Sequence, residues 1–336
     1  MGKMTNANAA PVLPVPDAVD NVEAGKRCLD EYGMFIHRNV LSPDEVATLA
    51  DRLVEQAELE REHDVGLISD QSYSGKTWYG GADGKLPAWQ GVMNLPNKGR
   101  VFMDLLYKNK LMHEYCAHAF RGVPYQLSAS NGLIQRKGCE PMTVHADCQW
   151  LPFREETPAI LNVFFCLSDF EEDMGATRVV PGSHRGPPPV VNYTDESGSV
   201  AGAEYETFPV ICKAGDMFGM ESRLWHQSGA STSERTRLCA TVVWSQFWMK
   251  PINLYPQTLH DDVYAALSPE ELDLLGFKVD AGGLFEPRYP GDRQPTNRAE
   301  PYIPELRRGS AKRPAPAPTP RMHLDQFGFS KPKDEN

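Results

Sequence analysis

The sequence predicts an all-β core with flanking helices, and two observations carry this prediction. Seven short apolar runs between residues 125 and 247 are separated by Gly, Pro and polar residues, without helical segments between them. Close spacing of short strands is typical of a sandwich or barrel, and it argues against a doubly wound parallel sheet. The residues before 125, in contrast, include long stretches with helical periodicity. We therefore expect a jelly roll with helices packed around it.

Two helices and a strand are predicted at the start of this domain. Val22–Tyr32 has helical periodicity, and Met34–His37 is a short apolar run. The second helix has clear start signals, because Ser42 can cap it, Pro43 suits its first position and Glu45 completes a capping box. This helix is expected to continue to about residue 61.

The segment 62–100 is rich in glycine and contains Trp78, Tyr79 and Trp89. Segments of this kind in compact domains are usually lids or binding loops, or else disordered. These rings would either form an aromatic lid over a hydrophobic small molecule or fill part of the core. Helical spacing resumes at Val101–Phe120.

The remaining elements are short strands followed by one more helix, which has Ser268 at its start. The predicted domain covers residues 22–285, between a flexible N-terminal segment at 1–21 and an extended Pro-rich tail at 286–336. The predicted strands are Tyr125–Ser130, Leu133–Arg136, Met142–Trp150, Ala159–Leu167, Phe208–Cys212, Asp216–Met220 and Arg237–Phe247, and the helix is Ser268–Leu275.

Composition excludes several classes of function. With 34 Lys and Arg against 45 Asp and Glu, the net charge of −11 argues against a nucleic-acid or anionic membrane partner, both of which need a basic face. The sequence contains no apolar run of the roughly 18 residues that a membrane-spanning helix needs. Its N-terminal residues lack the apolar core of a signal peptide, so we expect a cytoplasmic protein. The seven scattered cysteines are expected to be reduced core thiols.

Three familiar catalytic patterns are incomplete. The Gly-Lys-Thr at 75–77 lacks the first glycine of a phosphate-binding loop. His113 and His118 are spaced i, i+5, which places them on different faces of a helix and excludes a zinc protease motif. Ser183 follows Pro-Gly instead of the Gly-x of a nucleophile elbow, so serine hydrolase chemistry has little support.

One constellation does fit a known chemistry. His145 and Asp147 lie in the predicted strand Met142–Trp150, where residues i and i+2 project from the same face about 6.6 Å apart. His226 follows 81 residues later in a segment with turn and strand character. Two histidines and one carboxylate form the facial triad of non-haem Fe(II) oxygenases, which leaves three coordination positions open. A His-x-Asp pair alone is more often a hydrogen-bonded strand pair.

Arg237 strengthens this interpretation. It begins the aliphatic run 238–244, where a buried strand is expected, and a buried guanidinium needs an anionic partner. Because guanidinium groups pair well with carboxylates, the distal carboxylate of 2-oxoglutarate would fit. The alternatives are an Asp or Glu from a neighbouring strand, or a side chain that extends to solvent.

These residues resemble a known family. His145-Ala146-Asp147, the run DMGATRVVPGSHR at 173–185, and LWHQSG at 224–229 followed by Arg237 are similar to the phytanoyl-CoA dioxygenase family of Fe(II)/2-oxoglutarate oxygenases. The likeness covers roughly residues 22–280 and implies a double-stranded β-helix, the cupin-like jelly roll.

The resemblance also implies roles for individual residues. His145, Asp147 and His226 are expected to hold Fe(II), and Arg237 is expected to bind 2-oxoglutarate. Thr177 and Gln135 match positions that help to line the cosubstrate pocket, and His184 is expected to stabilise a turn.

Two departures from the family pattern are informative. Ala230-Ser231 stands where members commonly have Pro-Asn, which leaves the geometry of that loop open. Asp147 is retained, whereas related halogenases have a small residue there, so hydroxylation is favoured over halogenation.

The predicted function is therefore a dioxygenase that hydroxylates an aliphatic carbon of a small hydrophobic metabolite. O₂ would be the cosubstrate, and succinate and CO₂ the co-products. The alternatives are a non-catalytic jelly roll that binds a metal or ligand, and the same chemistry on a fatty acyl-CoA, which the acidic charge disfavours. Demethylation of nucleic acid is disfavoured by the same charge. The oligomeric state stays open.

Overall fold

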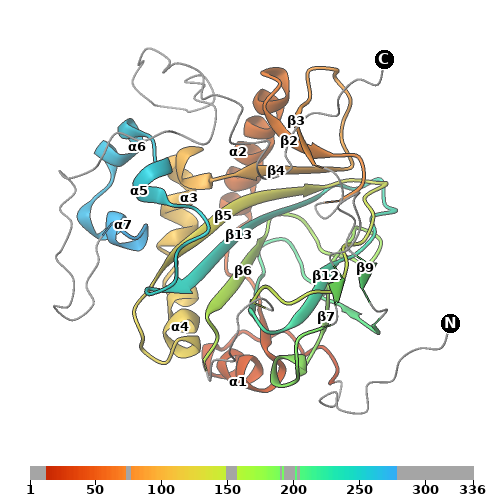
Figure 1. Cartoon of the computed structure of the whole chain (residues 1–336), viewed down its shortest axis with the longest axis vertical. Coiled ribbons are helices and arrows are strands. Elements are labelled where there is room, and N and C mark those ends of the chain that lie inside the picture. Colours follow the sequence, from red (N-terminus) through yellow and green to blue (C-terminus); the bar gives the residue numbers. More distant parts are fainter. Residues whose placement is uncertain are drawn as a thin grey trace.

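Two packed β-sheets form the centre of the protein, as a computed structural model shows (Figure 1). The structure describes residues 13–72, 77–148, 157–189, 191–192, 201–202 and 205–277. An eight-stranded antiparallel sheet has the order β1-β11-β6-β13-β5-β4-β2-β3, and a three-stranded sheet has the order β10-β7-β12. This arrangement confirms the predicted all-β core with flanking helices, a double-stranded β-helix.

The strands are mostly short, and β5 and β13 are the longest. The strands of the large sheet are β1 (Met34–His37), β2 (Gly66–Ser69), β3 (Trp78–Gly80), β4 (Trp89–Met93), β5 (Tyr125–Gln135), β6 (Ile160–Cys166), β11 (Met217–Glu221) and β13 (Arg237–Gln246). The others are β7 (Thr177–Val180), β8 (Val191–Asn192), β9 (Ala201–Gly202), β10 (Phe208–Pro209) and β12 (Trp225–Ser228).

The helices lie mainly before β5 and after β13. They are α1 (Val22–Tyr32), α2 (Pro43–Glu62), the single turn η1 (Leu95–Asn97), α3 (Arg100–Phe102), the π-helical turn η2 (Met103–Tyr107), α4 (Lys110–Ala119), η3 (Ser183–Arg185), α5 (Tyr255–Thr258), α6 (Asp261–Ala266) and α7 (Pro269–Leu274).

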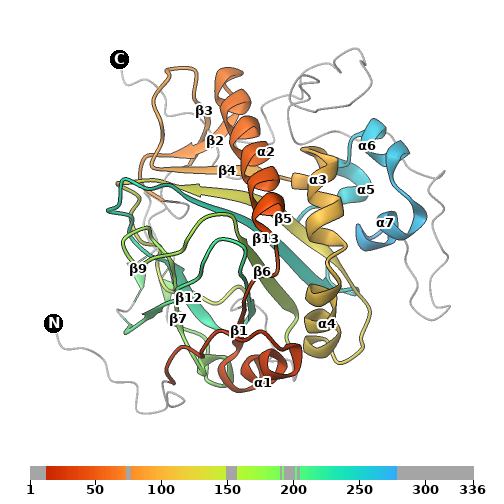
Figure 2. The same ribbon diagram turned by 180° about the vertical axis from the view of Figure 1, so that it is seen from behind.

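The two faces of the large sheet have different roles. On β13, Ala240, Val242 and Trp244 belong to the larger hydrophobic core, which they share with residues of α2 and α4. Figure 2 shows these helices lying across that face. Because side chains alternate along a strand, Cys239 points to the other face, where it shares a second core with Val179 of β7. The candidate site lies on this second face, between the two sheets.

The predicted start signals of the helices are confirmed. The Ser42 hydroxyl accepts from the Glu45 amide at 3.3 Å, while the Glu45 carboxylate accepts from the Ser42 amide at 2.8 Å, which completes the capping box. The helix α1 ends at Gly33, whose φ of 77° is a conformation that glycine adopts without strain.

Four predicted elements differ from the structure. The helix expected at 101–120 is divided, because Asn109 accepts a hydrogen bond from the Met112 amide at 3.0 Å and so caps a new helix, α4. The two strands predicted at 125–130 and 133–136 form one continuous strand, β5. The strand predicted at Met142–Trp150 is wrong over the described residues up to 148, which are irregular apart from a single bridge at His145.

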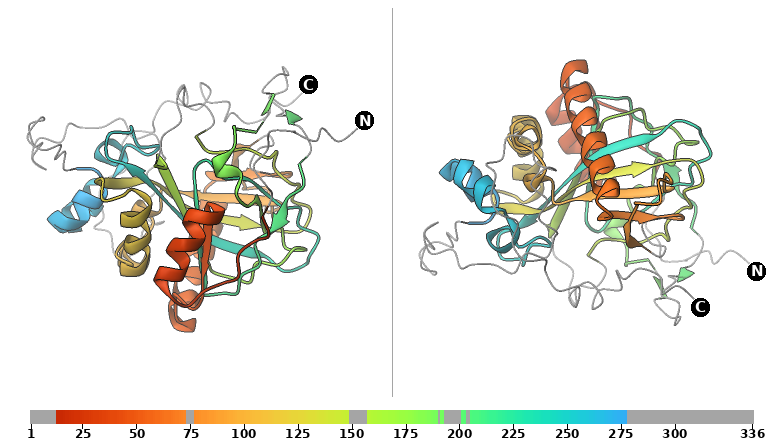
Figure 3. Two further views of the ribbon diagram at one scale, coloured as in Figure 1. Left: turned by 90° about the horizontal axis from the view of Figure 1, so that it is seen from below. Right: turned by 90° about the horizontal axis from the view of Figure 1, so that it is seen from above.

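The segment 62–100 is not simply a loop. Its strands β2, β3 and β4 extend the large sheet beyond β5, as Figure 3 shows from two further directions. Trp89 is 3% exposed and packs with Leu67 and Cys139, so it fills core. The proposed role of this segment as a lid stays a prediction.

The N-terminal segment also differs from the expected flexible chain. The Val19 amide donates to Ile36 at 2.9 Å and the Arg38 amide donates to Val19 at 2.8 Å, so residues 13–21 are tied to β1. Residues 1–12 and the predicted tail at 286–336 lie outside the described residues. Over the part of the chain that the structure describes, no helix is long and apolar enough to span a bilayer.

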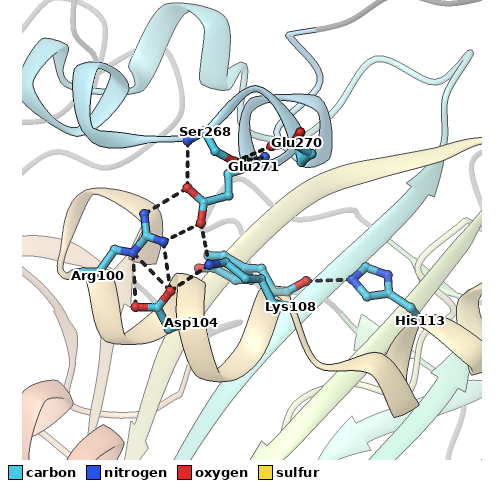
Figure 4. Close-up of polar contacts among 8 residues, drawn as sticks. Arg100, Asp104, Lys108, His113, Ser268, Glu270 and Glu271 are labelled. Atoms are coloured by element: carbon cyan, nitrogen blue, oxygen red, sulfur yellow. Dashed lines mark hydrogen bonds and ion pairs between the residues drawn. The ribbon is translucent and has the colours of Figure 1, made fainter.

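An ion-pair network fastens the C-terminal helices to the body of the domain (Figure 4). Glu271 of α7 is 5% exposed and pairs with Arg100 and with Lys108. Both cations also pair with Asp104, each at 2.9 Å. Burial raises the pKa of Glu271, but the hydrogen bonds from Arg100 and Lys108 outweigh burial and lower it to about 2. The network therefore holds an ionised carboxylate at a nearly buried position.

Candidate metal centre

Three side chains from two segments of the chain lie close together between the sheets. His226 lies on β12, and His145 forms a backbone bridge to it. The His145 amide donates to His226 at 3.0 Å, and the His226 amide donates to His145 at 2.9 Å. Asp147 follows two residues later. One ligand atom from each of the three side chains lies within 4.8 Å of the others.

The orientation of both imidazoles is fixed by their backbone partners. Nδ1 of His145 lies 2.9 Å from the carbonyl of Thr143, and Nδ1 of His226 lies 2.9 Å from the carbonyl of Leu224. Because a carbonyl only accepts, Nδ1 carries a hydrogen in each ring, and the neutral form of either ring therefore has its lone pair on Nε2. Each Nε2 lies 3.7 Å from one oxygen of Asp147. Two neutral imidazole nitrogens and a carboxylate oxygen therefore face one another, which is the donor set that a facial triad requires.

Burial favours the neutral form of His226. Burial lowers the pKa of His226 to about 4, against the opposing effect of Asp147. An uncharged imidazole is the form that binds a metal ion. The side chains of His145 and Asp147 are 23% and 27% exposed, whereas that of His226 is 9% exposed. His145 and Asp147 are thus partly accessible to solvent, whereas His226 is nearly buried.

Asn162 of β6 also contacts this site. Its side-chain amide donates a hydrogen bond to Oδ2 of Asp147. This residue is 8% exposed and lies between β11 and β13, opposite Met220 and Val243. This contact was not predictable from the sequence, because it joins residues of different segments through their tertiary arrangement.

Arg237 is buried without a carboxylate partner among the described residues. It is 4% exposed, donates to the carbonyl of Gly175, and lies with its guanidinium carbon 4.8 Å from the centre of the Phe170 ring. Its Nε has no hydrogen-bond partner. Burial lowers the pKa of this guanidinium, as expected for a cation removed from water. Within the described part of the chain, Arg237 has no Asp or Glu partner, and its side chain does not extend to solvent.

Gln135 lies beside Arg237, and Thr177 lies close in sequence to Gly175, whose carbonyl accepts from Arg237. Gln135 is the register partner of Arg237 on β5. It donates to Gly229 at 2.8 Å, and its side-chain oxygen is buried without a hydrogen-bond partner. Thr177 is buried on β7, two residues beyond Gly175. The structure therefore brings Gln135 and Arg237 together around Gly175, a contact residue that the sequence analysis did not identify.

All seven cysteines lie in the described part of the chain. None of the seven cysteines forms a disulfide, and six of them are buried. Burial raises the pKa of Cys139 to about 11 and that of Cys239 to about 12. These thiols lie close enough to Arg237 to influence its pKa, yet they stay uncharged and do not neutralise it.

One family model and several curated proteins are similar in sequence to this chain. The family model described as phytanoyl-CoA dioxygenase matches residues 29–239. Dioxygenase sphC of Aspergillus fumigatus is 27% identical over 195 residues, which cover 55% of this chain and 51% of that protein. Multifunctional dioxygenase prhA of Penicillium brasilianum is 26% identical over 189 residues, which cover 53% of this chain and 62% of that protein. The chain thus spans about half to three-fifths of the length of these curated relatives.

Solved structures support the fold. The non-heme alpha ketoglutarate dependent carbocyclase SnoK from nogalamycin biosynthesis has a TM-score of 0.50 and 20% identity, over 74% of this chain and 91% of that chain. The epimerase SnoN, crystallised with Fe³⁺, alpha ketoglutarate and a nogalamycin compound, has a TM-score of 0.50 and 21% identity, over 67% of this chain and 83% of that chain. At this level of identity the likeness concerns the fold alone.

Proposed function

Because the chain belongs to the phytanoyl-CoA dioxygenase family, we propose that it is an Fe(II)- and 2-oxoglutarate-dependent dioxygenase that hydroxylates a small hydrophobic metabolite. The oxidised position would be an aliphatic carbon, with O₂ as cosubstrate and with succinate and CO₂ as co-products. The observation that carries this proposal is the convergence of His145, Asp147 and His226, with a buried and unneutralised Arg237 on the same side of the large sheet.

The donor set supports iron as the metal. Neutral imidazoles and one carboxylate suit Fe(II), and the three side chains occupy one side of the ion so that the other side is left for ligands. Bound Fe(II) would supply the oxidising chemistry together with 2-oxoglutarate and O₂. The backbone contacts of Thr143 and Leu224 would hold both rings in the ligating tautomer before the ion arrives.

Arg237 would bind the distal carboxylate of 2-oxoglutarate. Its buried Nε is a donor that still lacks an acceptor, and a carboxylate would supply one. The neighbouring Gln135 and Thr177 would help to line the pocket around the cosubstrate. Fixing one end of the cosubstrate in this way would orient its other end toward the triad.

The surroundings of the triad support a hydrophobic substrate. Phe164 and Phe218 stack with ring centres 4.5 Å apart on the sheet face that also carries Asn162. Val243 lies opposite Asn162 on β13. The names of the similar proteins also concern small molecules, since SnoK and SnoN belong to nogalamycin biosynthesis. A polyanionic acyl-CoA is disfavoured by the net charge of −11.

The test is a screen for substrate-stimulated succinate release. Hydrophobic terpenoid and polyketide metabolites would be compared with fatty acyl-CoA esters, with Fe(II) and O₂ supplied. A hydrophobic metabolite that stimulates succinate release and gains one oxygen atom would support the proposal. Stimulation by acyl-CoA esters alone would overturn the substrate class, and an absence of 2-oxoglutarate turnover under every condition would favour a non-catalytic binding protein.

A further inference from the structure

We propose that Asn162 is a positioning residue that limits Asp147 to binding the metal through a single oxygen. This inference rests on the proposed function, because it assumes that the triad holds a metal ion. It concerns the number of coordination positions that stay free, which decides whether a bidentate cosubstrate and O₂ can bind together.

The geometry around the Asp147 carboxylate does not by itself favour either of its two oxygens as the metal ligand. Oδ1 lies 3.7 Å from Nε2 of His145, and Oδ2 lies 3.7 Å from Nε2 of His226. The two oxygens therefore face the two imidazoles in the same way. Carboxylates bind cations through one oxygen or through both, and this geometry alone would permit either mode.

Asn162 removes this symmetry. Its amide donates only to Oδ2, which engages a lone pair of that oxygen and leaves Oδ1 as the better ligand. An amide is suited to this role because it donates a hydrogen bond without bringing a positive charge close to the cation. Binding through Oδ1 alone would keep three of the metal's positions open, whereas binding through both oxygens would fill one of them.

The position of Asn162 in the sheet restricts the movement of its side chain, and therefore also that of the Asp147 carboxylate to which it donates. The residue lies in the middle of the large sheet, paired with Met220 of β11 on one side and with Val243 of β13 on the other. It is 8% exposed, so neighbouring side chains restrict its movement. Asp147, in contrast, lies in a segment without regular structure, and it depends on such a partner for its orientation.

The experiment uses Mn(II) as the probe, with the full chain and without cosubstrate. It measures two quantities for the wild type and for Asn162→Leu, which keeps the approximate shape but lacks the donor. The first is the dissociation constant for Mn(II). The second is the number of water molecules bound to the ion, counted from the broadening of the Mn(II) magnetic resonance signal in ¹⁷O-labelled water. The matched control is Asn131→Leu on β5, because Asn131 is also an asparagine of this sheet and its side chain accepts from the Asn94 amide at 3.3 Å.

We expect Asn162→Leu to weaken Mn(II) binding by roughly 10- to 100-fold, the usual effect of removing an outer partner of a metal ligand. The count of bound waters should fall from about three to about two as Asp147 takes a second position. Asn131→Leu should match the wild type in both measurements. A loss of folding alone does not change the number of waters on the ion that still binds, so this count separates positioning from stability.

The inference would be overturned if Asn162→Leu binds Mn(II) with the wild-type affinity and with three bound waters. This outcome requires that Asp147→Ala abolishes Mn(II) binding, which shows that the site itself holds the ion. Equal, weak binding by the wild type and Asp147→Ala would overturn the metal site itself, and with it the proposed function. If Asn162→Leu does not fold, Asn162→Ala takes its place, since the smaller side chain fits the same strand and carries the same expectations.

Discussion

His145 and His226 exchange two backbone hydrogen bonds, at 3.0 and 2.9 Å, so that the two imidazoles lie with ring centres 4.3 Å apart. This bridge joins an irregular segment to β12. It brings together two side chains that are 81 positions apart in the sequence. The relative position of the two rings is therefore set by main-chain contacts, which side-chain substitutions elsewhere in the site leave intact.

Replacement of Arg237 by alanine should raise the concentration of 2-oxoglutarate needed for half-maximal turnover. A hydrogen bond to a charged group is worth about 1.5–3 kcal/mol, which corresponds to roughly a 10- to 100-fold change. The requirement is measured by succinate release at varied 2-oxoglutarate. The matched control is Arg235→Ala, because Arg235 is exposed and already pairs with Glu171 and Asp173. A larger effect of Arg235→Ala would move the cosubstrate contact to that residue.

Gly175→Ala should weaken 2-oxoglutarate binding through the backbone. Gly175 has φ of 75°, and an added Cβ would lie 2.4 Å from the side-chain nitrogen of Gln135 and 2.9 Å from the carbonyl of Gly229. The carbonyl that accepts from Arg237 would then shift. Gly138→Ala is the control that separates backbone strain from steric contact. The φ of Gly138 is 91°, but nothing lies within 4 Å of the Cβ that alanine would add. Both variants should lose about 1–3 kcal/mol of stability, and only Gly175→Ala should raise the 2-oxoglutarate requirement. Equal requirements in the two variants would contradict this.

Glu271→Gln should destabilise the fold. The substitution removes a nearly buried carboxylate that accepts from Arg100 and Lys108, and we expect a loss of about 1.5–3 kcal/mol in the free energy of unfolding. Denaturant unfolding measures it. The neighbouring Glu270→Gln is the control, because Glu270 is exposed and, among the described residues, its carboxylate accepts a side-chain hydrogen bond from Ser268 alone. Equal losses in the two variants would show that the ion-pair network contributes nothing.

The same carboxylate predicts a dependence on pH. The pKa of Glu271 in the folded protein is about 2, below its ordinary value of 4.5. A lowered pKa stabilises the fold fully above the ordinary value, and this contribution is lost as the pH falls from 4.5 toward 2. The stability difference between wild type and Glu271→Gln should therefore be constant above pH 5 and narrow below about 4.5. A difference that stays constant down to pH 3 would contradict the assigned pKa.

The sequence was sufficient to predict those helix boundaries that are set by neighbouring residues. The capping box at Ser42 and Glu45 needs only neighbouring residues, and it is present in the structure. The segment 62–100 was harder to interpret, because β2, β3 and β4 are short and become strands through pairing at the edge of the sheet. The strand expected around His145 is irregular for a similar reason, since its pairing with β12 is limited to one bridge.

The candidate site likewise contains residues that the sequence predicted and residues that it did not. The spacing of His145 and Asp147 and the similarity around His226 and Arg237 were sufficient to predict which side chains would come together. The partners that orient them were not predictable, because Asn162 and Gly175 carry no catalytic signature of their own. Each reaches the site only through the register of the sheets and the turn before β7.

The most direct test of the account is an anaerobic titration of the protein with Fe(II) and 2-oxoglutarate, monitored by visible absorption. We expect the weak absorption band of the iron and 2-oxoglutarate chelate in the wild type. The band should be absent from His145→Ala, Asp147→Ala and His226→Ala, although these variants keep the wild-type circular dichroism spectrum. A band of undiminished strength in these folded variants, or no band in the wild type, would contradict the assignment of the three residues as the iron site.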